Sequence, residues 1–322
     1  MGGGSTSMKE GINVLSLFDG MSCGQIALER AGIKVANYYA SEIDRHSIKV
    51  TQANYPYTIQ LGDITNINGD KLPQIDLVIG GSPCQGFSIA GKQLAFEDER
   101  SKLYFEYERL LKEVKPKYFL LENVKMKKEY RDTISSRLGV EPILINSSLV
   151  SAQNRHRWYW TNIEGVTQPE DKGILLNEVL EKEVDIKYYI KAGRADWLKK
   201  FGEVKEHQGY IAFNPNKAKC LTVRGELSWN TTYIVQRPRG TNGGGVKSIN
   251  GKTPSITTSS LEHNNTLIDE GIVRRLTPVE CERLQTVPDN YTNCLSDSQR
   301  YKALGNGWTI DVITHILKGL KL

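Results

Sequence analysis

Short apolar runs alternate with segments of helical periodicity along the first half of the chain. The runs are five to eight residues long and rich in Val, Ile, Leu and aromatic side chains, which predicts strands buried on both faces. These strands are expected at residues 12–17, 35–41, 76–80, 118–122, 142–149 and 158–162. Helices are expected between them, at residues 25–31, 47–54 and 103–114. Such alternation requires crossover connections and predicts a doubly wound, mostly parallel α/β sheet.

The pattern changes about halfway along the chain. Residues 165–268 are richer in Asn, Thr, Gly and basic side chains and contain only short strand-like pieces. They predict a smaller domain inserted into the first one. Helical patterns return at residues 277–284 and 311–320, so residues 269–322 are expected to complete the domain that begins with residues 8–164.

The composition is that of an ordinary globular protein. Hydrophobic residues make up 39% of the chain, and no apolar run reaches the roughly 18 residues that a membrane span needs. The 42 basic and 37 acidic residues leave a net charge of +5, which permits a polyanionic partner without requiring one. Cysteines without a CxxC pair and histidines without HxH or HExxH spacing predict a cytoplasmic protein with no metal site. Residues 1–7 are interpreted as an appended linker ahead of Met8.

Two reactive side chains follow predicted strands. Cys84 comes shortly after the strand that ends at Gly80, and Glu122 is the last residue of the strand at 118–122. The carboxyl ends of adjacent parallel strands meet at the edge of the sheet where α/β enzymes hold their ligands. A thiol and an acid together suggest covalent addition to an electrophilic ring or carbonyl, with the acid protonating the atom that gathers charge.

Three further strand ends carry groups suited to a ligand. The turn at residues 17–24 offers backbone amides and a helix N-terminus, although it has neither the GxGxxG spacing of dinucleotide folds nor a Walker lysine. Glu42 ends the second strand, where an acidic residue can accept the hydroxyls of a ribose, and Asp63 ends the next strand-like piece. Each alone is most simply a turn or cap residue, but together they predict one pocket.

These positions belong to a longer series of short motifs. The series is Phe18 to Gly20, Glu42 to Asp44, Gly62 to Ile64, Gly81 to Gln85, Glu122 to Val124, Gln153 to Arg157, Arg275 to Cys281 and Gly305 to Gly307. In order and spacing it resembles the motifs of the DNA (cytosine-5) methyltransferases, and the loop from Cys84 to Gln93 is especially similar to that of small bacterial and phage modification enzymes. The resemblance covers the chain from about Ile12 onward, except for the insertion. Asp19 and Trp308 depart from the residues more common at their positions.

The resemblance implies a Rossmann-like methyltransferase fold with S-adenosylmethionine as the cofactor. It also implies which residues contact that cofactor. They are Phe18, Asp19, Gly20, Cys23, Gly24, Glu42, Ile43, Asp63, Ile64, Pro83, Asn306, Gly307 and Trp308. The cysteines other than Cys84 are expected to pack as small hydrophobic residues.

The resemblance further implies a methyl transfer to carbon 5 of a cytosine. Cys84 would add to carbon 6, and Glu122 would protonate ring nitrogen 3 or share a proton with it. Arg157 and Arg155 would hold the 2-carbonyl oxygen and nearby phosphate oxygens. No thiol can reach carbon 6 inside a stacked duplex, so the target base must be flipped out.

Contacts to double-stranded DNA are expected from two segments. By resemblance, the loop at residues 85–103 closes over the base, and the glycine-rich residues 240–245 approach from the opposite groove. The expected DNA-binding residues are Gln85, Ser88, Arg224, Arg237, Arg239, Gly243 and Gly244. The insertion is therefore interpreted as a target-recognition domain, with a plain flexible loop and a solvated basic strand as the alternatives. Arg274 and Arg275 are either a solvated pair or phosphate contacts.

Two other functions remain open from sequence. One is an RNA cytosine methyltransferase on the same fold, although the transfer-RNA branch typically carries a Cys-Phe-Thr motif that this chain lacks. The other is a catalytically silent DNA-binding relative, disfavoured because Cys84, Glu122 and Arg157 are all present. We expect a monomer that acts in the cytoplasm, at the nucleoid or in a phage-infected cell. The sequence does not indicate whether a cognate restriction endonuclease accompanies it.

Overall fold

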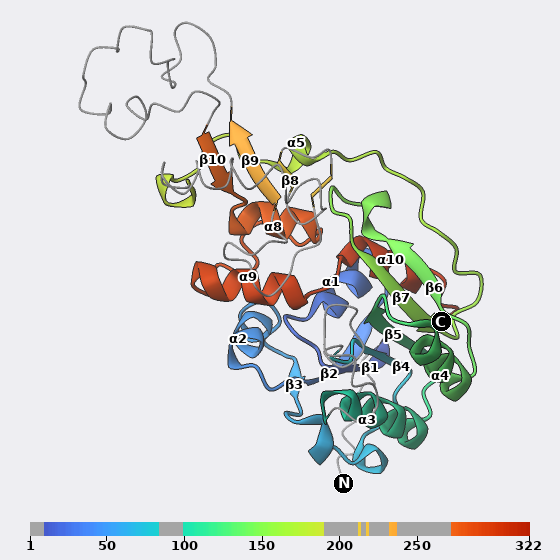
Figure 1. Ribbon diagram of the computed structural model, residues 1–322. Coiled ribbons are helices and arrows are strands. Elements are labelled where there is room, and N and C mark those ends of the chain that lie inside the picture. Colours follow the sequence, from blue (N-terminus) through green and yellow to red (C-terminus); the bar gives the residue numbers. More distant parts are fainter. Residues whose placement is uncertain (1–9, 84–98, 190–211, 214–216, 219–231, 237–271) are drawn as a thin grey trace, which may run out of the picture.

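The computed structural model describes residues 10–83, 99–189, 212–213, 217–218, 232–236 and 272–322 (Figure 1). Its main body is a seven-stranded sheet with the strand order β3-β2-β1-β4-β5-β7-β6. The strands are β1 (Ile12–Leu17), β2 (Val35–Ser41), β3 (Ile59–Gln60), β4 (Leu77–Gly80), β5 (Tyr118–Val124), β6 (Ile143–Asn146) and β7 (His156–Thr161). The first five in spatial order are parallel, whereas β7 runs antiparallel to both β5 and β6. The predicted doubly wound, mostly parallel sheet is confirmed.

The chain builds the sheet first on one side of β1 and then on the other. From β1 the chain proceeds outward through β2 and β3 and then crosses to β4 and β5 on the other side of β1. The carboxyl ends of β1 and β4 therefore flank the crevice in which open α/β sheets bind their ligands.

Helices cover both faces of the sheet. Val14 and Leu77 belong to one buried cluster, whereas their neighbours Leu15 and Val78 belong to the other, because successive side chains of a strand point to opposite faces. The first cluster is covered by α1 (Cys23–Arg30), α2 (Arg45–Asn54), α8 (Pro278–Leu284), α9 (Asp297–Asn306) and α10 (Ile310–Leu317). The second is covered by α3 (Glu99–Val114) and α4 (Lys128–Leu138). Burial on both faces explains why these strands read as nearly continuous apolar runs.

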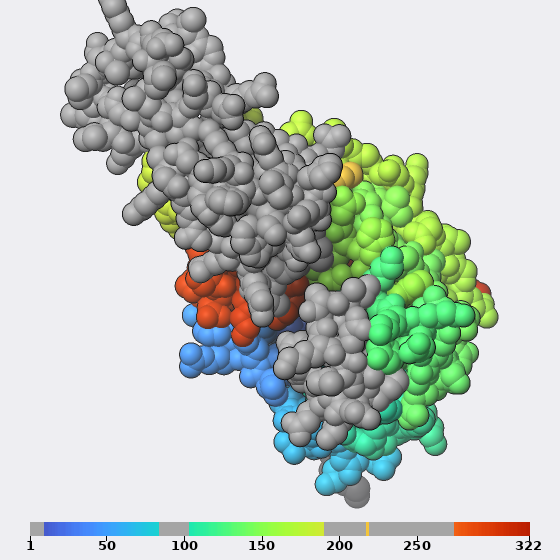
Figure 2. Space-filling view, viewed as in Figure 1, coloured from blue at the N-terminus to red at the C-terminus, as the bar shows by residue number. Residues whose placement is uncertain are grey.

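The C-terminal helices pack beside the first helices of the chain. Arg30 on α1 donates to Asp311 on α10, 281 positions later, at 2.7 Å. In Figure 2 the blue N-terminal and red C-terminal segments accordingly form one continuous body. Among the described residues, no helix is long and apolar enough to cross a membrane.

A second, three-stranded sheet contains β8 (Ala212–Phe213), β9 (Thr232–Gln236) and β10 (Ile272–Arg275). β9 pairs in parallel with β8 and antiparallel with β10. β10 thus extends the small sheet beyond residue 268, where the insertion was predicted to end. Near the start of the predicted insertion, Leu176 on α5 (Leu176–Val179) is buried in the core of the main sheet. Arg274 on β10 is fully buried and pairs with Glu280 on α8. Both expectations for Arg274, a solvated side chain and a phosphate contact, are wrong.

Some elements differ from those predicted. α4 and α9 were not expected, because each carries too few apolar residues at helical spacing; α4 buries only Ile134 and Ser135. The strand expected at residues 142–149 ends at Asn146, whose side chain accepts a hydrogen bond from Ser148 N–H and starts a 3₁₀ turn at Ser147–Leu149. Similar 3₁₀ turns lie at Ile64–Asn66, Gly69–Lys71 and Ile186–Tyr188.

Candidate active site

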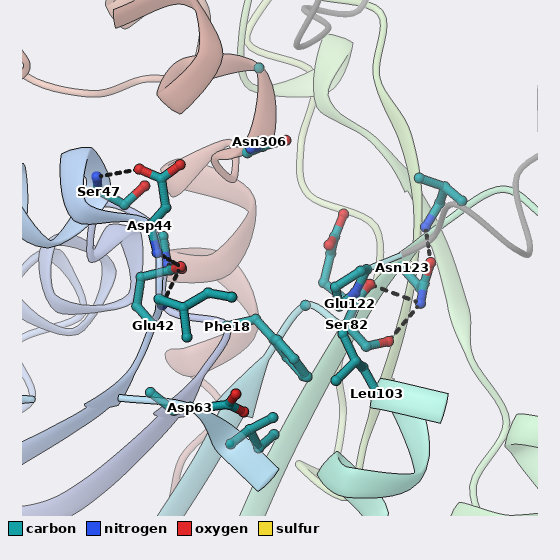
Figure 3. A pocket seen from close by; sticks show the side chains of 18 of the residues that line it. Phe18, Glu42, Asp44, Ser47, Asp63, Ser82, Leu103, Glu122, Asn123 and Asn306 are labelled. Atoms are coloured by element: carbon teal, nitrogen blue, oxygen red, sulfur yellow. Dashed lines mark hydrogen bonds between the residues drawn. The ribbon is translucent and has the colours of Figure 1, made fainter. Parts of the chain in front are cut away.

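A cavity of about 500 Å³ opens at the carboxyl ends of β1, β2, β4 and β5 (Figure 3). Eleven of the residues predicted for the site line this cavity. They are Phe18, Gly20, Glu42, Ile43, Asp63, Ile64, Pro83, Glu122, Arg155, Arg157 and Asn306. These residues run from Phe18 to Asn306 in the sequence. The motifs show only their order along the chain, and the fold brings their side chains together at one cavity.

Five further predicted residues do not line the cavity: Asp19, Cys23, Gly24, Gly307 and Trp308. The two glycines allow close packing near the first turn. A Cβ on Gly24 would lie 2.4 Å from the Ile79 side chain, and a Cβ on Gly307 would lie 2.8 Å from that of Met21. The assignment of all five residues as cofactor contacts stays a prediction.

The remaining predicted residues lie outside the described part of the chain. They are Cys84, Gln85, Ser88, Arg224, Arg237, Arg239, Gly243 and Gly244.

The turn after β1 has an unusual backbone. Phe18, Gly20 and Ser22 have φ angles of 56°, 60° and 59°, in the left-handed region. Non-glycine residues pay roughly 1–2 kcal/mol for this conformation, so surrounding contacts must stabilise the turn. Asp19 N–H donates to the Ser41 carbonyl at 3.0 Å, and Gly20 N–H donates to Glu42 Oε2 at 2.8 Å. The end of β2 therefore holds the turn in place.

Asp19 is a buried carboxyl beneath this turn. Tyr38 Oη donates to its Oδ1 at 2.8 Å, and Ser22 Oγ donates to its Oδ2. Burial raises the pKa of Asp19 to about 6, against the hydrogen bonds that lower it.

This shift predicts a pH dependence of stability. Between about pH 4 and pH 6 the folded protein retains a proton on Asp19 that the unfolded chain has released, so the free energy of unfolding should fall as pH rises through this window. The difference between the folded and unfolded pKa values of Asp19 corresponds to about 3 kcal/mol in the free energy of unfolding. Urea unfolding of the wild type and Asp19→Asn from pH 4 to pH 7 measures it. A difference between the two proteins that stays constant over this range would contradict the prediction.

The β2 side of the cavity combines fixed carboxylates with exposed apolar surface. Glu42 accepts hydrogen bonds from the N–H groups of Gly20, Ile43 and Asp44 at 2.7–2.8 Å, which fixes the direction of its carboxylate. Asp63 is held by Thr65 N–H at 2.9 Å. The Ile43 side chain is 75% exposed although it lines the cavity. An oriented acid beside uncovered apolar surface suits a ligand with a sugar diol and a flat ring.

The β5 side of the cavity carries Glu122. Its side chain is buried, and Oε1 lies 2.8 Å from Nε of Arg157, which comes from the neighbouring strand β7. A Cβ on Gly81 would lie 3.0 Å from both Glu122 Oε2 and Trp308 Nε1. A larger residue at position 81 would therefore be in tight contact with both side chains, which favours glycine there.

Ser82 and Asn123 join the ends of β4 and β5. Both side chains are buried, and Asn123 Nδ2 donates to Ser82 Oγ at 3.0 Å, while Asn123 Oδ1 accepts from Val124 N–H at 2.8 Å (Figure 3). Pro83, the next residue, lines the cavity. The hydrogen bond between Asn123 and Ser82 therefore holds the chain that follows β4 against the end of β5.

Arg155 connects the cavity to the C-terminal segment. Its side chain is buried, and Nη2 donates to the Gly307 carbonyl at 2.9 Å and lies 3.4 Å from the Gly305 carbonyl. These carbonyls lie at the C-terminal end of α9, where helical carbonyls lack partners and a positive charge is favourable. These contacts hold the C-terminal end of α9, which contains Asn306. Contact of Arg155 with the base stays a prediction.

Two of the described cysteines, Cys23 and Cys281, are poor nucleophiles. Cys23 and Cys281 are buried, and burial raises the pKa of the Cys23 thiol to about 12 and that of Cys281 well above its usual value. Among the residues that the structure describes, no cluster of three or more His, Cys, Asp or Glu side chains could hold a metal ion.

Sequence reasoning missed three lining residues that lie outside the motifs and outside the expected loop at residues 85–103: Ser41, Ser47 and Thr65. Ser47 lies in the first turn of α2 and Thr65 in the first turn of a 3₁₀ helix, each N-capped by an acidic residue of a recognised motif. The signal was present, because the first turn of a helix that follows a strand end faces the same edge of the sheet. Ser41 is the last residue of β2 and directly precedes Glu42. Leu103, near the start of α3, lines the cavity and is the last residue of the loop expected to close over the base.

Comparisons with known proteins agree on one family. The sequence-family model of the C-5 cytosine-specific DNA methylases matches residues 12–322 of this chain. The type II methyltransferase M.HpaII of Haemophilus parainfluenzae is 32% identical over 95% of this chain and 88% of its own length. The orphan methyltransferase M.SPRI of Bacillus phage SPR is 28% identical over 96% of this chain and 97% of its own. The solved structure of the Entamoeba histolytica methyltransferase EhMeth has the same fold, with a TM-score of 0.73 at 18% identity over 96% of this chain and 98% of that one.

Proposed function

Because the chain belongs to the C-5 cytosine-specific DNA methylase family, we propose that it methylates carbon 5 of a flipped-out cytosine in double-stranded DNA, with S-adenosylmethionine as the methyl donor. One observation carries this proposal. A single cavity joins the oriented carboxylate of Glu42 and the exposed side chain of Ile43 to the buried Glu122–Arg157 pair. A nucleoside-bearing cofactor and a target base can therefore meet in it.

The residues on the β2 side fit the cofactor. Glu42 would accept the ribose hydroxyls, and Phe18, Ile43 and Ile64 would contact the adenine ring. When bound, S-adenosylmethionine supplies an electrophilic methyl group. Phe18 and Gly20 on the first turn and Asn306 at the other wall would hold the cofactor beside Glu122.

The residues on the β4 and β5 side would act on the base. Cys84, one residue beyond Pro83, would add its thiolate to carbon 6, and Glu122 would give a proton to ring nitrogen 3 as charge gathers there. Arg157 would orient the Glu122 carboxylate through the 2.8 Å contact and contribute positive charge beside the 2-carbonyl oxygen. Carbon 5 would then take the methyl group. Loss of the carbon 5 proton, elimination of the Cys84 thiolate and return of the nitrogen 3 proton to Glu122 would restore the aromatic ring.

A methyl-transfer assay with labelled cofactor tests the substrate. We expect label on mixed-sequence duplex DNA and none on transfer RNA. Label on transfer RNA alone would support the RNA-modifying alternative, and no label on either would support a silent DNA-binding relative. Bisulfite sequencing of DNA from cells that express the protein would then locate the modified cytosines.

Replacing Glu122 with glutamine is expected to lower kcat by roughly a hundredfold or more, because glutamine keeps the shape of the side chain but cannot donate the proton. Cofactor affinity, measured by calorimetry, should change little, because Glu122 lies on the β5 side of the cavity. Glu141→Gln, at an exposed carboxylate, serves as the control. If Glu122→Gln instead lost cofactor binding and kept its turnover rate, Glu122 would be a cofactor ligand.

A further inference from the structure

Three exposed lysines follow the end of β5. Lys125, Lys127 and Lys128 come directly after Val124, which lines the cavity. Within the described part of the chain, no carboxylate forms an ion pair with any of them. One acidic residue, Glu129, lies in the adjoining first turn of α4, so the segment keeps a positive charge of two.

This basic segment is anchored to the core. Met126, between the lysines, is buried in the cluster beneath α3 and α4. Farther along α4, the Arg131 guanidinium lies 5.3 Å from the centroid of the Trp158 ring on β7. The lysine side chains are thus exposed on a segment that the core holds in place.

The segment also lies next to the Glu122–Arg157 pair. Val124 is opposite Arg157 in the β5–β7 register, so Lys125 continues towards His156. Burial lowers the pKa of His156, and the charges of Lys125 and Arg157 lower it further. The lysines therefore supply positive charge outside the cavity, beyond Arg157, whose own charge is paired with Glu122.

We propose that Lys125, Lys127 and Lys128 bind backbone phosphates of the DNA strand that carries the target cytosine. This inference rests on the proposed function. A base that enters the cavity leaves its flanking phosphates at the rim. Lys125 directly follows Val124, which lines the cavity and pairs with Arg157 in the β5–β7 register. Lysine is a flexible point charge that suits phosphate oxygens and not the bidentate reading of a base edge. The lysines therefore contribute affinity and leave the sequence preference to other residues.

The same strand provides a matched control. Lys115 and Lys117 are exposed and precede β5, whereas Lys127 and Lys128 follow it, so the two pairs lie towards opposite ends of one strand. One double variant replaces Lys127 and Lys128 with glutamine, and the control double variant replaces Lys115 and Lys117 with glutamine. Both remove the same net charge. Any difference between them reports the location of the charge.

Binding to a mixed-sequence DNA duplex is measured by fluorescence anisotropy over a range of salt concentrations. For the Lys127 and Lys128 variant we expect about tenfold weaker binding, and a slope of log affinity against log salt that is shallower by about two, since each phosphate contact contributes about 0.9. The control should match the wild type. Cofactor affinity and kcat at saturating DNA should be unchanged in both variants, which also shows that they are folded.

Equal slopes for the two double variants would overturn the proposal, as would a changed sequence preference in the Lys127 and Lys128 variant. The single variant Lys125→Gln gives a second test, with an expected slope change of about one. Failure of the proposed function would look different, because the wild type itself would then label no duplex DNA.

Discussion

Replacing Cys84 with alanine is expected to abolish methyl transfer to DNA while leaving DNA binding intact. The thiolate acts in covalent chemistry and not in phosphate contact, so its loss removes the reaction and not the complex. The structure supports this choice of nucleophile indirectly. Asn123 donates a hydrogen bond to Ser82, and Pro83, the residue before Cys84 in the sequence, lines the cavity. Cys23 and Cys281 are buried thiols with raised pKa values.

Two measurements check this prediction. The labelled-methyl assay should show no transfer for Cys84→Ala and normal transfer for the control Cys294→Ala, at a partly exposed cysteine. A duplex that contains 5-fluorocytosine should become covalently attached to the wild type, because fluorine cannot leave as the proton does, and denaturing gels detect the adduct. Methylation by Cys84→Ala would refute the covalent mechanism.

Replacing Glu280 with glutamine is expected to lower the free energy of unfolding by about 3–5 kcal/mol. Glu280 and Arg274 are both fully buried and form two contacts of 2.8 Å. Removing the negative charge leaves the Arg274 guanidinium buried without a counter-charge. The Arg274 Nε already has no hydrogen-bond partner among the described residues, so the remaining charge would be poorly compensated.

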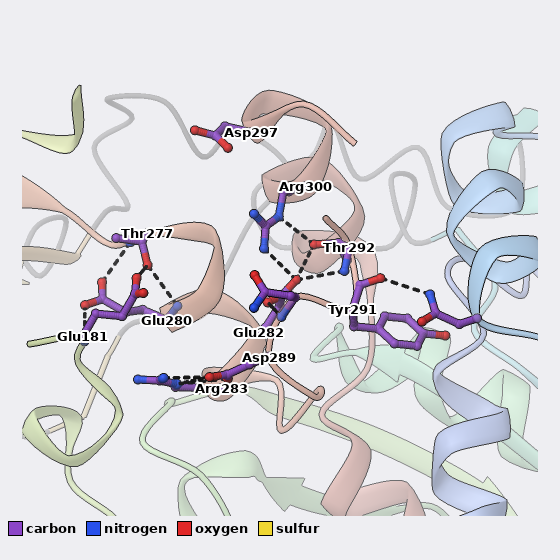
Figure 4. A network of polar contacts seen from close by, with 12 residues as sticks. Glu181, Thr277, Glu280, Glu282, Arg283, Asp289, Tyr291, Thr292, Asp297 and Arg300 are labelled. Atoms are coloured by element: carbon purple, nitrogen blue, oxygen red, sulfur yellow. Dashed lines mark hydrogen bonds and ion pairs between the residues drawn. The ribbon is translucent and has the colours of Figure 1, made fainter. Parts of the chain in front are cut away.

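Glu280 also joins segments that lie far apart in the sequence. Its Oε2 accepts from Thr277 N–H at 2.8 Å, which caps α8, and its Oε1 accepts from Glu181 N–H at 2.9 Å (Figure 4). Glu181 follows α5, and Arg274 belongs to β10 of the small sheet. The cost of the substitution therefore includes the alignment of three chain segments.

The neighbouring surface pair provides the control. Arg283 on the same helix pairs with Asp289 at 2.7 Å, but their side chains are 33% and 44% exposed. Asp289→Asn should therefore cost no more than about 1 kcal/mol. Urea unfolding compares the two variants. Similar losses for Glu280→Gln and Asp289→Asn would contradict this account.

The sequence by itself determined the sheet and the location of the site. β1 and β2 begin and end where their apolar runs predict, and β4 and β5 differ by one and two residues. Strands buried on both faces need continuous apolar runs, which are visible without tertiary information. Glu42 and Glu122 were recognised because each lies where such a run ends, and parallel strands bring their carboxyl ends to one edge.

Only the tertiary structure decided what several polar residues do. Arg155, expected at the base, contacts carbonyls 150 and 152 positions away, and Arg274, expected in solvent or on phosphate, is buried against Glu280. Gly81 looked like part of a motif, but the structure shows that it makes room for Glu122 and Trp308. Hydrophobic periodicity reports only which face of an element is buried. The partner of a buried charge depends on which distant segments the fold brings within about 3 Å, and a local pattern does not contain that information.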